Sequence, residues 1–266
     1  MQDQSTKTAL ITGASSGIGK ELALIHAAAG DDLILVARRE ERLKELKKEL
    51  ESQYGITVHV IPADLSVSNA PREVFDHIGK QNLRVDYLIS NAGFSQQGYF
   101  HETDWKVIES MIMVNVMAMT RLAHLFIPQM VECGSGRIMF VASSAAFAPG
   151  GPLQSTYYAT KSMIVSLSQG LAGELVDNGV TVTALCPGAT ATEFEEVSGL
   201  DKTPLFEREK VFTAKEVAKD GYEAMMNGDL VKLTGLTTMN KLILKNMNLI
   251  PTKRVLEGIR ERQEKT

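Results

Sequence analysis

Short apolar runs alternate with longer amphipathic stretches along the chain. Each run is bounded by glycine, proline or polar residues and has the length of a buried strand. The stretches between the runs have the length and apolar spacing of helices, as in the charged stretch 40–51, whose exposed face pairs Glu with Lys. This order predicts a single α/β domain over residues 1–266, a doubly wound parallel sheet with helices on both faces. We expect strands at residues 8–11, 33–36, 58–62, 85–90, 137–142 and 180–185.

The first predicted strand runs directly into a glycine-rich turn and then into a helical pattern. Glycine lets the backbone turn sharply and approach a ligand closely, and the N-terminus of the following helix presents free N–H groups to a phosphate. The spacing Gly-x-x-x-Gly-x-Gly departs from the common dinucleotide pattern Gly-x-Gly-x-x-Gly, but strand, turn and helix follow in the same order. We predict nucleotide binding here rather than a purely structural turn, through Gly13, Ser15, Ser16, Gly17, Ile18 and Gly19.

Two arginines, Arg38 and Arg39, follow the second predicted strand. An NAD-selective site places an acidic residue at this point, where it binds the ribose hydroxyl of the adenosine. A guanidinium instead suits a phosphate, through paired hydrogen bonds. We therefore expect NADP (NADPH) as the cofactor rather than NAD. The alternative is that the two arginines only begin the charged helix.

Polar and glycine residues also follow three further predicted strands. In a doubly wound sheet, ligands bind beyond the carboxyl ends of the strands, so these residues fall on the expected cofactor rim. Asp and Asn are also common turn residues, which is the alternative interpretation. The candidates are Asp64 and Leu65 after the third strand, Asn91, Ala92 and Gly93 after the fourth, and Pro187, Gly188, Thr190 and Thr192 after the sixth.

Three reactive side chains fall close together near the fifth predicted strand. Ser144 follows that strand, and Tyr157 and Lys161 open a long helical stretch. Residues four apart on a helix are separated by about 6 Å of rise, so the phenol and the ammonium lie on one face. A free tyrosine titrates at about pH 10, and we expect the neighbouring cation to lower the pKa of Tyr157. A chance Tyr-x-x-x-Lys, with the tyrosine in the core and the lysine in water, is the alternative.

Asn115 lies within an apolar, methionine-rich helical stretch. Asparagine is a poor helix former, and its amide needs a hydrogen-bond partner in such surroundings. Water, the substrate machinery and a helical carbonyl are the three candidates for that partner.

The composition is that of an ordinary globular protein, with 44% hydrophobic and 23% charged residues. A net charge of −4 gives no reason to expect a nucleic-acid partner. The two cysteines, Cys133 and Cys186, form neither a disulfide framework nor a metal spacing, and Cys186 is expected to be a small buried residue. Without a secretory pattern or about 18 consecutive apolar residues, we expect a cytoplasmic protein with no transmembrane segment.

Two segments stand apart from the alternating pattern. Residues 193–211 are polar and irregular, which suggests either a lid over the substrate or an ordinary surface loop. Residues 241–266 hold seven Lys or Arg against three Glu, a net charge of +4, interleaved with apolar residues. We expect this basic extension to pack over the substrate cleft or at a subunit contact, and binding to a membrane surface or a partner is the alternative.

Taken in order, the motifs resemble those of the short-chain dehydrogenase/reductase family over nearly the whole chain. The resemblance implies a Rossmann-like fold and a homodimer or homotetramer. It also implies that Ser144 orients and polarises a substrate carbonyl and that Tyr157 gives or takes its proton. Lys161 would hold the nicotinamide ribose and lower the pKa of the tyrosine, and Asn115 would hold a water that connects Lys161 to solvent. The matching set is Thr12-Gly13-x-x-x-Gly17-x-Gly19, Asn91-Ala92-Gly93, Asn115, Ser144, Tyr157-x-x-x-Lys161 and Pro187-Gly188.

These inferences together predict an NADP-dependent oxidoreductase that moves a hydride between the nicotinamide and a small-molecule carbonyl/alcohol pair. The alternative is a non-catalytic nucleotide-sensing or scaffold protein on the same fold. That alternative predicts a broken catalytic set, whereas all four catalytic positions are filled in this sequence.

Overall fold

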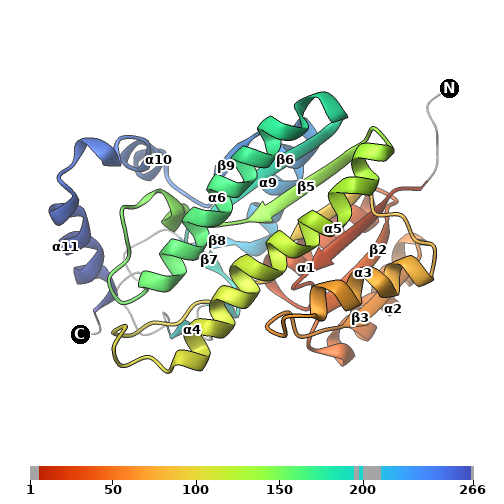
Figure 1. Cartoon of the computed structure of the whole chain (residues 1–266), viewed down its shortest axis with the longest axis horizontal. Helices are drawn as coiled ribbons and strands as arrows, with labels where there is room; N and C mark the ends of the chain where they lie inside the picture. Colours follow the sequence, from red (N-terminus) through yellow and green to blue (C-terminus); the bar gives the residue numbers. More distant parts are fainter. Residues whose placement is uncertain (1–5, 195–197, 200–210, 265–266) are drawn as a thin grey trace.

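A seven-stranded parallel sheet forms the centre of the molecule (Figure 1). The computed structural model describes residues 6–194, 198–199 and 211–264. The strand order is β3-β2-β1-β4-β5-β6-β9, which confirms the predicted doubly wound sheet. Each of the six predicted strands agrees with an observed one to within two residues, and β9 was not predicted. The bounds are β1 Thr8–Thr12, β2 Asp32–Ala37, β3 Val58–Pro62, β4 Tyr87–Ser90, β5 Gly136–Val141, β6 Val180–Pro187 and β9 Val231–Thr234.

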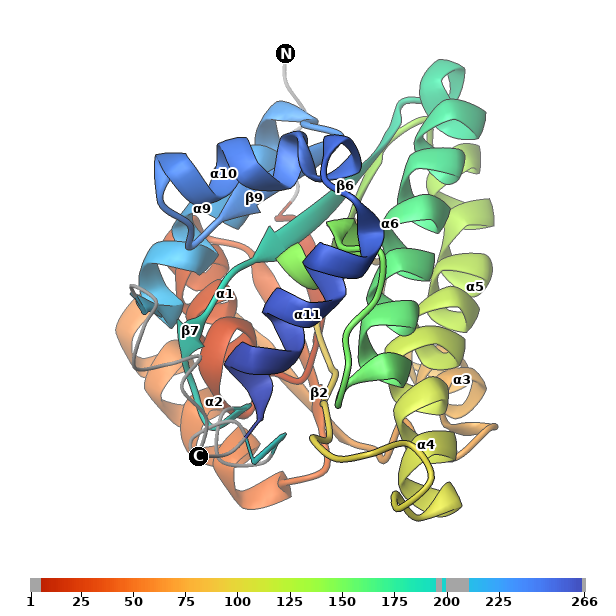
Figure 2. The same ribbon diagram turned by 90° about the vertical axis from the view of Figure 1, so that its left-hand side faces the viewer.

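Helices cover both faces of the sheet (Figures 1 and 2). On one face lie α3 (Ala70–Lys80), α5 (Met119–Glu132) and α6 (Ser155–Leu175). On the other face lie α1 (Gly17–Ala28), α2 (Glu40–Tyr54) and α9 (Ala214–Asn227). The strands are therefore buried on both sides, which explains why the sequence shows them as continuous apolar runs.

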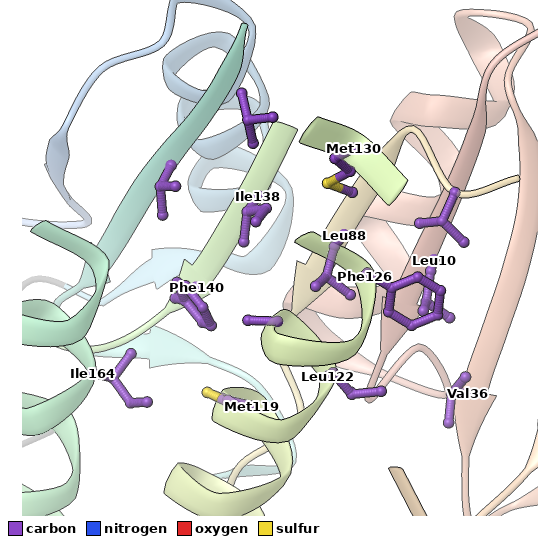
Figure 3. Close-up of a cluster of buried hydrophobic side chains, with 14 of the residues drawn as sticks. Leu10, Val36, Leu88, Met119, Leu122, Phe126, Met130, Ile138, Phe140 and Ile164 are labelled. Atoms are coloured by element: carbon purple, nitrogen blue, oxygen red, sulfur yellow. The ribbon is translucent and has the colours of Figure 1, made fainter. Parts of the chain in front are cut away.

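The buried side chains form two cores that share the sheet between them. Along β1, Leu10 belongs to one core, and Ala9 and Ile11 belong to the other. This alternation follows from the two-residue repeat of a strand. Figure 3 shows the first core, which includes Leu10 of β1 and Phe126 of α5.

The order of the strands reverses at β1, which lies between β2 and β4. The chain first builds outward from β1 through β2 to β3, and then builds in the opposite direction from β4 to β9. The connections after β1 and β4 therefore diverge and leave a crevice at the carboxyl ends of these strands. The fold thus predicts the place of a ligand before any side chain is considered.

The helix α9 shows how local sequence fixes an element. Thr213 and Glu216 form a reciprocal capping box at its N-terminus, and Gly228, with φ +75°, ends it. Gly221 lets the helix approach the sheet closely, since a Cβ there would lie 2.6 Å from a methyl carbon of Leu185. This close packing places β9, which follows α9, beside β6.

A long helical segment, Trp105–Glu132, joins β4 to β5 and contains 28 residues. It consists of α4 (Trp105–Ile112), the π-helical turn η1 (Met113–Ala118) and α5. By length and composition alone, it is the one helix in the described part of the chain that could cross a membrane. The core helix of a folded domain passes the same test, and Phe126 of this segment is buried against the sheet.

The C-terminal elements gather on one side of the molecule (Figures 1 and 2). They are α10 (Thr238–Lys245), the short 3-10 helix η5 (Met247–Leu249) and α11 (Thr252–Gln263). A two-stranded sheet of β7 (Thr190–Ala191) and β8 (Phe212–Thr213) flanks the segment that was predicted to be a lid. Most of that segment, residues 195–197 and 200–210, lies outside the described residues.

Candidate active site

One cavity of about 890 Å³ lies beyond the carboxyl ends of β1, β4, β5 and β6. It brings together residues predicted from six separate stretches of sequence. All the predicted cofactor-binding and catalytic residues line it except Gly19 and Asn115, which lie behind its wall. The crevice expected from the strand order and the site expected from the motifs are therefore the same place.

The glycine turn after β1 is held in position by the end of β4. Asn91 donates from Nδ2 to the carbonyl oxygen of Thr12 at 2.9 Å, and Thr12 Oγ1 accepts from the backbone N–H groups of Asn91 and Ala92. Gly13 has φ +68°, and a Cβ there would lie 2.7 Å from Asn91 Nδ2. The corresponding distance at Gly19 is 2.5 Å. Glycine is thus needed at both positions, and Asn91 acts by shaping the turn.

Arg39 extends across the glycine turn. Its guanidinium donates to Ser15 Oγ at 2.9 Å and to Ser16 Oγ at 2.7 Å, and it pairs with Glu193 at 2.6 Å. Arg42 pairs with the other oxygen of Glu193, and Arg42 and then Arg39 lower the pKa of this carboxyl to about 2. A guanidinium and two hydroxyls at the edge of a cavity suit a phosphate group, so these residues fit the 2′-phosphate of NADP.

Tyr157 lies in the cavity with only 8% of its surface exposed. Burial raises the pKa of its phenol to about 12, although a hydrogen bond with the Ser143 side chain acts in the opposite direction. Its ring lies against that of Phe194, with 5.7 Å between centroids. At neutral pH the phenol is therefore protonated and can donate to a ligand in the cavity.

Lys161 follows one helical turn later on α6 and is 3% exposed. Its Nζ donates to the carbonyl oxygen of Val141 at 2.9 Å and lies 5.7 Å from the centre of the Tyr157 ring. Burial lowers the pKa of Lys161 to about 8. The expectation that the ammonium would bring the pKa of Tyr157 below its ordinary value is wrong for this structure. Burial disfavours the charged form of both groups, and for the phenol it is the largest influence.

The hydroxyl that reaches the Tyr157 phenol belongs to Ser143 rather than to Ser144. Ser143 has an extended backbone after β5, and its side chain accepts from the N–H of Ala145 at 3.1 Å. Ser144 lines the same cavity but begins the 3-10 helix η2 (Ser144–Phe147). Ser143 is therefore a second candidate beside Ser144, whose predicted role stays a prediction.

Asn115 is fully buried in the π-helical turn η1, behind the cavity. Its side chain accepts from the N–H of Phe94 at 3.0 Å and donates to the carbonyl oxygen of Phe94 at 2.9 Å and to Thr160 Oγ1 at 3.3 Å. These contacts tie the segment after β4 to α6. Gly93 makes room for them, since a Cβ there would lie 3.1 Å from Asn115 Oδ1 and 3.3 Å from Lys161 Nζ. The bound water expected at Asn115 stays a prediction.

The other predicted rim residues frame the cavity with short local contacts. Asp64 accepts from the N–H of Ser66 at 3.0 Å and from its hydroxyl at 2.8 Å. Beyond β6, Thr190 Oγ1 donates to the carbonyl oxygen of Gly188 at 2.9 Å. A side chain at Gly188 would collide with the carbonyl oxygen of Gly235. Here glycine is required by the close approach of two backbones.

Comparison with known proteins agrees with this geometry. The family model for short chain dehydrogenases matches residues 7–202. The chain belongs to the short-chain dehydrogenase/reductase family. The resemblance seen in the sequence is thus confirmed, and the protein is an oxidoreductase of this family's type.

Three known proteins illustrate what this short-chain dehydrogenase is similar to. The very-long-chain 3-oxoacyl-CoA reductase of Anas platyrhynchos is 30% identical over 230 residues, which cover 84% of this chain and 71% of that protein. A short-chain dehydrogenase from Sphingobium yanoikuyae, solved in complex with NADPH, is 34% identical with a TM-score of 0.82, covering 97% and 98% of the two chains. The bulky-bulky ketone specific alcohol dehydrogenase from Comamonas testosteroni is 31% identical with a TM-score of 0.76, covering 91% and 93%.

The C-terminal segment of this dehydrogenase forms a further wall of the cavity, beyond the residues that the family model matches. Gln263 is buried and holds the end of α11 in place, donating to Gln154 Oε1 at 2.9 Å and to the Tyr158 hydroxyl at 3.1 Å. This placement favours packing over the cleft among the roles considered for the basic extension. The apolar side chains that it contributes are Ile243, Leu244, Met247, Ile250, Val255 and Ile259.

The sequence analysis missed Glu193 and Gln263 as residues of the site. Neither carries a local signal, because their partners lie more than a hundred positions away along the chain. Ser143 had a signal, namely its place beside Ser144 at a strand end. The expectation for Cys186 is confirmed: the residue is fully buried, and burial raises the pKa of its thiol to about 12, which excludes a reactive thiolate at neutral pH.

Proposed function

We propose that this dehydrogenase uses NADP to transfer a hydride between the nicotinamide and a carbonyl/alcohol pair, with Tyr157 as general acid or base. The observation that carries the proposal is the meeting of Tyr157, Ser143 and Lys161 in a cavity that also contains the glycine turn. A carbonyl oxygen at the Tyr157 hydroxyl would have a proton donor and a second hydroxyl within reach. When bound, the dinucleotide would supply or accept the hydride at its nicotinamide ring.

The state of each side chain at neutral pH fits reduction. Tyr157 is protonated because burial raises its pKa to about 12, so its hydroxyl can give a proton to the carbonyl oxygen as the carbonyl carbon gains the hydride. The Ser143 hydroxyl donates to the same oxygen and orients it. Lys161, whose pKa burial lowers to about 8, is still mostly protonated and favours the phenolate that remains on Tyr157.

Oxidation of an alcohol is the reverse reaction and needs the phenolate at the start. Burial disfavours that form, so oxidation is expected to be slow at neutral pH and to speed up as pH rises. Reduction therefore starts from the protonation state of Tyr157 that predominates near neutrality.

The preference for NADP is supported by the cluster of Arg39, Ser15 and Ser16, with Arg38 lining the cavity beside it. The similar enzyme from Sphingobium yanoikuyae was solved with NADPH. Glu193 shares the Arg39 guanidinium, so a bound phosphate would compete with this carboxylate.

A panel of aldehydes, ketones and secondary alcohols, followed by NADPH absorbance, tests the reaction class. We expect NADPH-dependent consumption of at least one class of carbonyl compound and little activity with NADH. Equal rates with the two cofactors would contradict the NADP preference. No turnover of any carbonyl or alcohol would contradict the proposed reaction.

The residue assignment is tested by comparing Arg39→Ala with Arg42→Ala. Both arginines pair with Glu193, but only Arg39 lines the cavity. Loss of a charge-assisted phosphate contact should weaken NADPH binding by about ten- to hundredfold in Arg39→Ala and leave NADH binding unchanged. Equal losses in the two variants would show that the effect comes from Glu193 rather than from the phosphate.

A further inference from the structure

The wall of the cavity formed by α11 carries different kinds of side chain at its ends and in its middle. The residues of this helix that line the cavity recur at positions i, i+1, i+4, i+5, i+8 and i+9, so they form a single face. From first to last this face extends over about 13 Å. It presents one arginine at each end, an apolar middle and a final glutamine, in the order Arg254, Val255, Gly258, Ile259, Arg262 and Gln263.

The two ends of this face differ in their contacts. At the C-terminal end, Gln263 is fixed by its hydrogen bonds to Gln154 and Tyr158. At the N-terminal end, Arg254 lies in the first turn of α11, is exposed, and has no acidic partner among the described residues. Its neighbour Lys253 carries the same charge but does not line the cavity. Within the described part of the chain, Arg254 is thus a guanidinium that lines the cavity without an acidic partner.

The charges around the cavity are unevenly divided. Among the described residues that line it, the acidic ones are Asp64 and Glu193. Both belong to the cofactor side, where Asp64 accepts from Ser66 and Glu193 pairs with Arg39 and Arg42. The acidic residues of α11 fall off the cavity-lining face. The described substrate side therefore presents arginine, amide and apolar side chains, and no carboxylate.

We propose that the preferred substrate is an elongated carbonyl compound with an apolar body and an anionic group, such as a carboxylate, that Arg254 binds. This inference rests on the proposed function, because it assigns the substrate class of the same cavity. The apolar body lies against Ile243, Ile250 and Ile259, which otherwise leave apolar surface facing the cavity. The guanidinium supplies paired donors for the anionic group.

A series of aryl ketones tests the proposal, each prepared as the carboxylate and as its methyl ester, with spacers of increasing length between the acid and the carbonyl. At the best spacer, the wild-type protein with NADPH should reduce the acid with a kcat/KM about ten- to hundredfold above that of the ester, mainly through KM. Arg254→Gln should lower kcat/KM for the acid about ten- to hundredfold, to the level of the ester, and Arg254→Lys should restore part of the preference. Lys253→Gln, the matched control, should retain the full preference.

Equal use of acid and ester throughout the series would overturn the proposal, and so would an equal loss in Lys253→Gln and Arg254→Gln. Calorimetric titration of the acid and its ester in the presence of NADPH separates failure of the proposed anion site from failure of the proposed reaction. Binding of the acid that depends on Arg254, without any turnover, would uphold the anion site and refute the reaction. Turnover of the ester without preference for the acid would uphold the reaction and refute the anion site.

Discussion

Replacing Lys161 by Met should change how the stability of the protein depends on pH. Lys161 is 3% exposed, and burial lowers its pKa from the ordinary 10.5 to about 8. Between these two pH values the unfolded chain holds a proton that the folded protein has released. The free energy of unfolding therefore rises with pH across this window. Below about pH 8 both states hold the proton, and burial of the charge then costs its full amount.

The size of this effect follows from the pKa difference. One pKa unit corresponds to about 1.4 kcal/mol, so the wild-type protein should gain about 3 kcal/mol relative to Lys161→Met across the whole window. Tyr157 acts with the opposite sign: its folded pKa of about 12 is raised, and its contribution is lost only as pH rises from about 10 toward 12. Cys186 also acts with the opposite sign above about pH 9, because burial raises the pKa of its thiol to about 12. Comparison with Lys161→Met below about pH 10 cancels the contributions that the two proteins share and leaves that of the lysine.

Urea unfolding of both proteins at intervals between about pH 7 and pH 10 measures the difference directly. The control is Lys219→Met, because the Lys219 side chain is 74% exposed and lies outside the site. Its curve should run parallel to that of the wild type. Parallel curves for Lys161→Met as well would refute the reasoning. They would show that the folded protein does not release this proton at a lower pH than the unfolded chain.

Three further substitutions test separate parts of the site. Ser143→Ala should lower kcat by about a hundred- to thousandfold through loss of a donor to the carbonyl oxygen, whereas Ser144→Ala should change it by less than about threefold in the same steady-state assay. Glu193→Gln should tighten NADPH binding by only about two- to fivefold, because the carboxylate is 41% exposed and its ion pairs are screened by solvent, and fluorescence titration with NADPH and NADH measures this effect. Asn115→Leu should lower the free energy of unfolding by about 2 to 3 kcal/mol, measured in urea, because it leaves the backbone of Phe94 unpaired.

Each of these expectations has a clear contrary result. A larger loss in Ser144→Ala than in Ser143→Ala would favour Ser144, the position predicted from the sequence. Equal tightening of NADPH and NADH by Glu193→Gln would mean that the carboxylate does not compete with a phosphate. An Asn115→Leu protein as stable as the wild type would show that its hydrogen bonds to Phe94 are replaced without cost.

The sheet could be predicted because its strands are buried on both faces. Leu10 and Ile11 are adjacent in sequence but belong to different cores, so the strand appears as a continuous apolar run. The edge strand β9 does not have this property. Lys232 interrupts its apolar residues, and only Thr234 is buried, so its pattern resembles that of a loop.

The motifs located the site because residues that follow parallel strands meet at one edge of the sheet. That argument placed Asn91, Arg39 and Gly188 on a common cavity. It could not resolve a choice between neighbours, as with Ser143 and Ser144, which depends on how one strand ends. It also could not give the pKa of Tyr157, because a spacing of four residues reveals the nearby lysine but not the depth of burial.

The wall formed by α11 was the least predictable part of the site. Its apolar and basic residues show no local feature that separates a cleft wall from a membrane-binding surface. The deciding contact joins Gln263 to Gln154, 109 positions earlier in the chain. Such contacts follow from the folded arrangement and not from local pattern.

The central claim is that the phenol of Tyr157 gives the proton in an NADPH-dependent reduction. Rapid mixing of the NADPH complex with a carbonyl substrate, in a single turnover, tests it in the wild type and in Tyr157→Phe. The account predicts that the variant binds NADPH within about twofold of the wild type and transfers hydride about a hundred- to ten-thousandfold more slowly. Hydride transfer at the wild-type rate in Tyr157→Phe would contradict it.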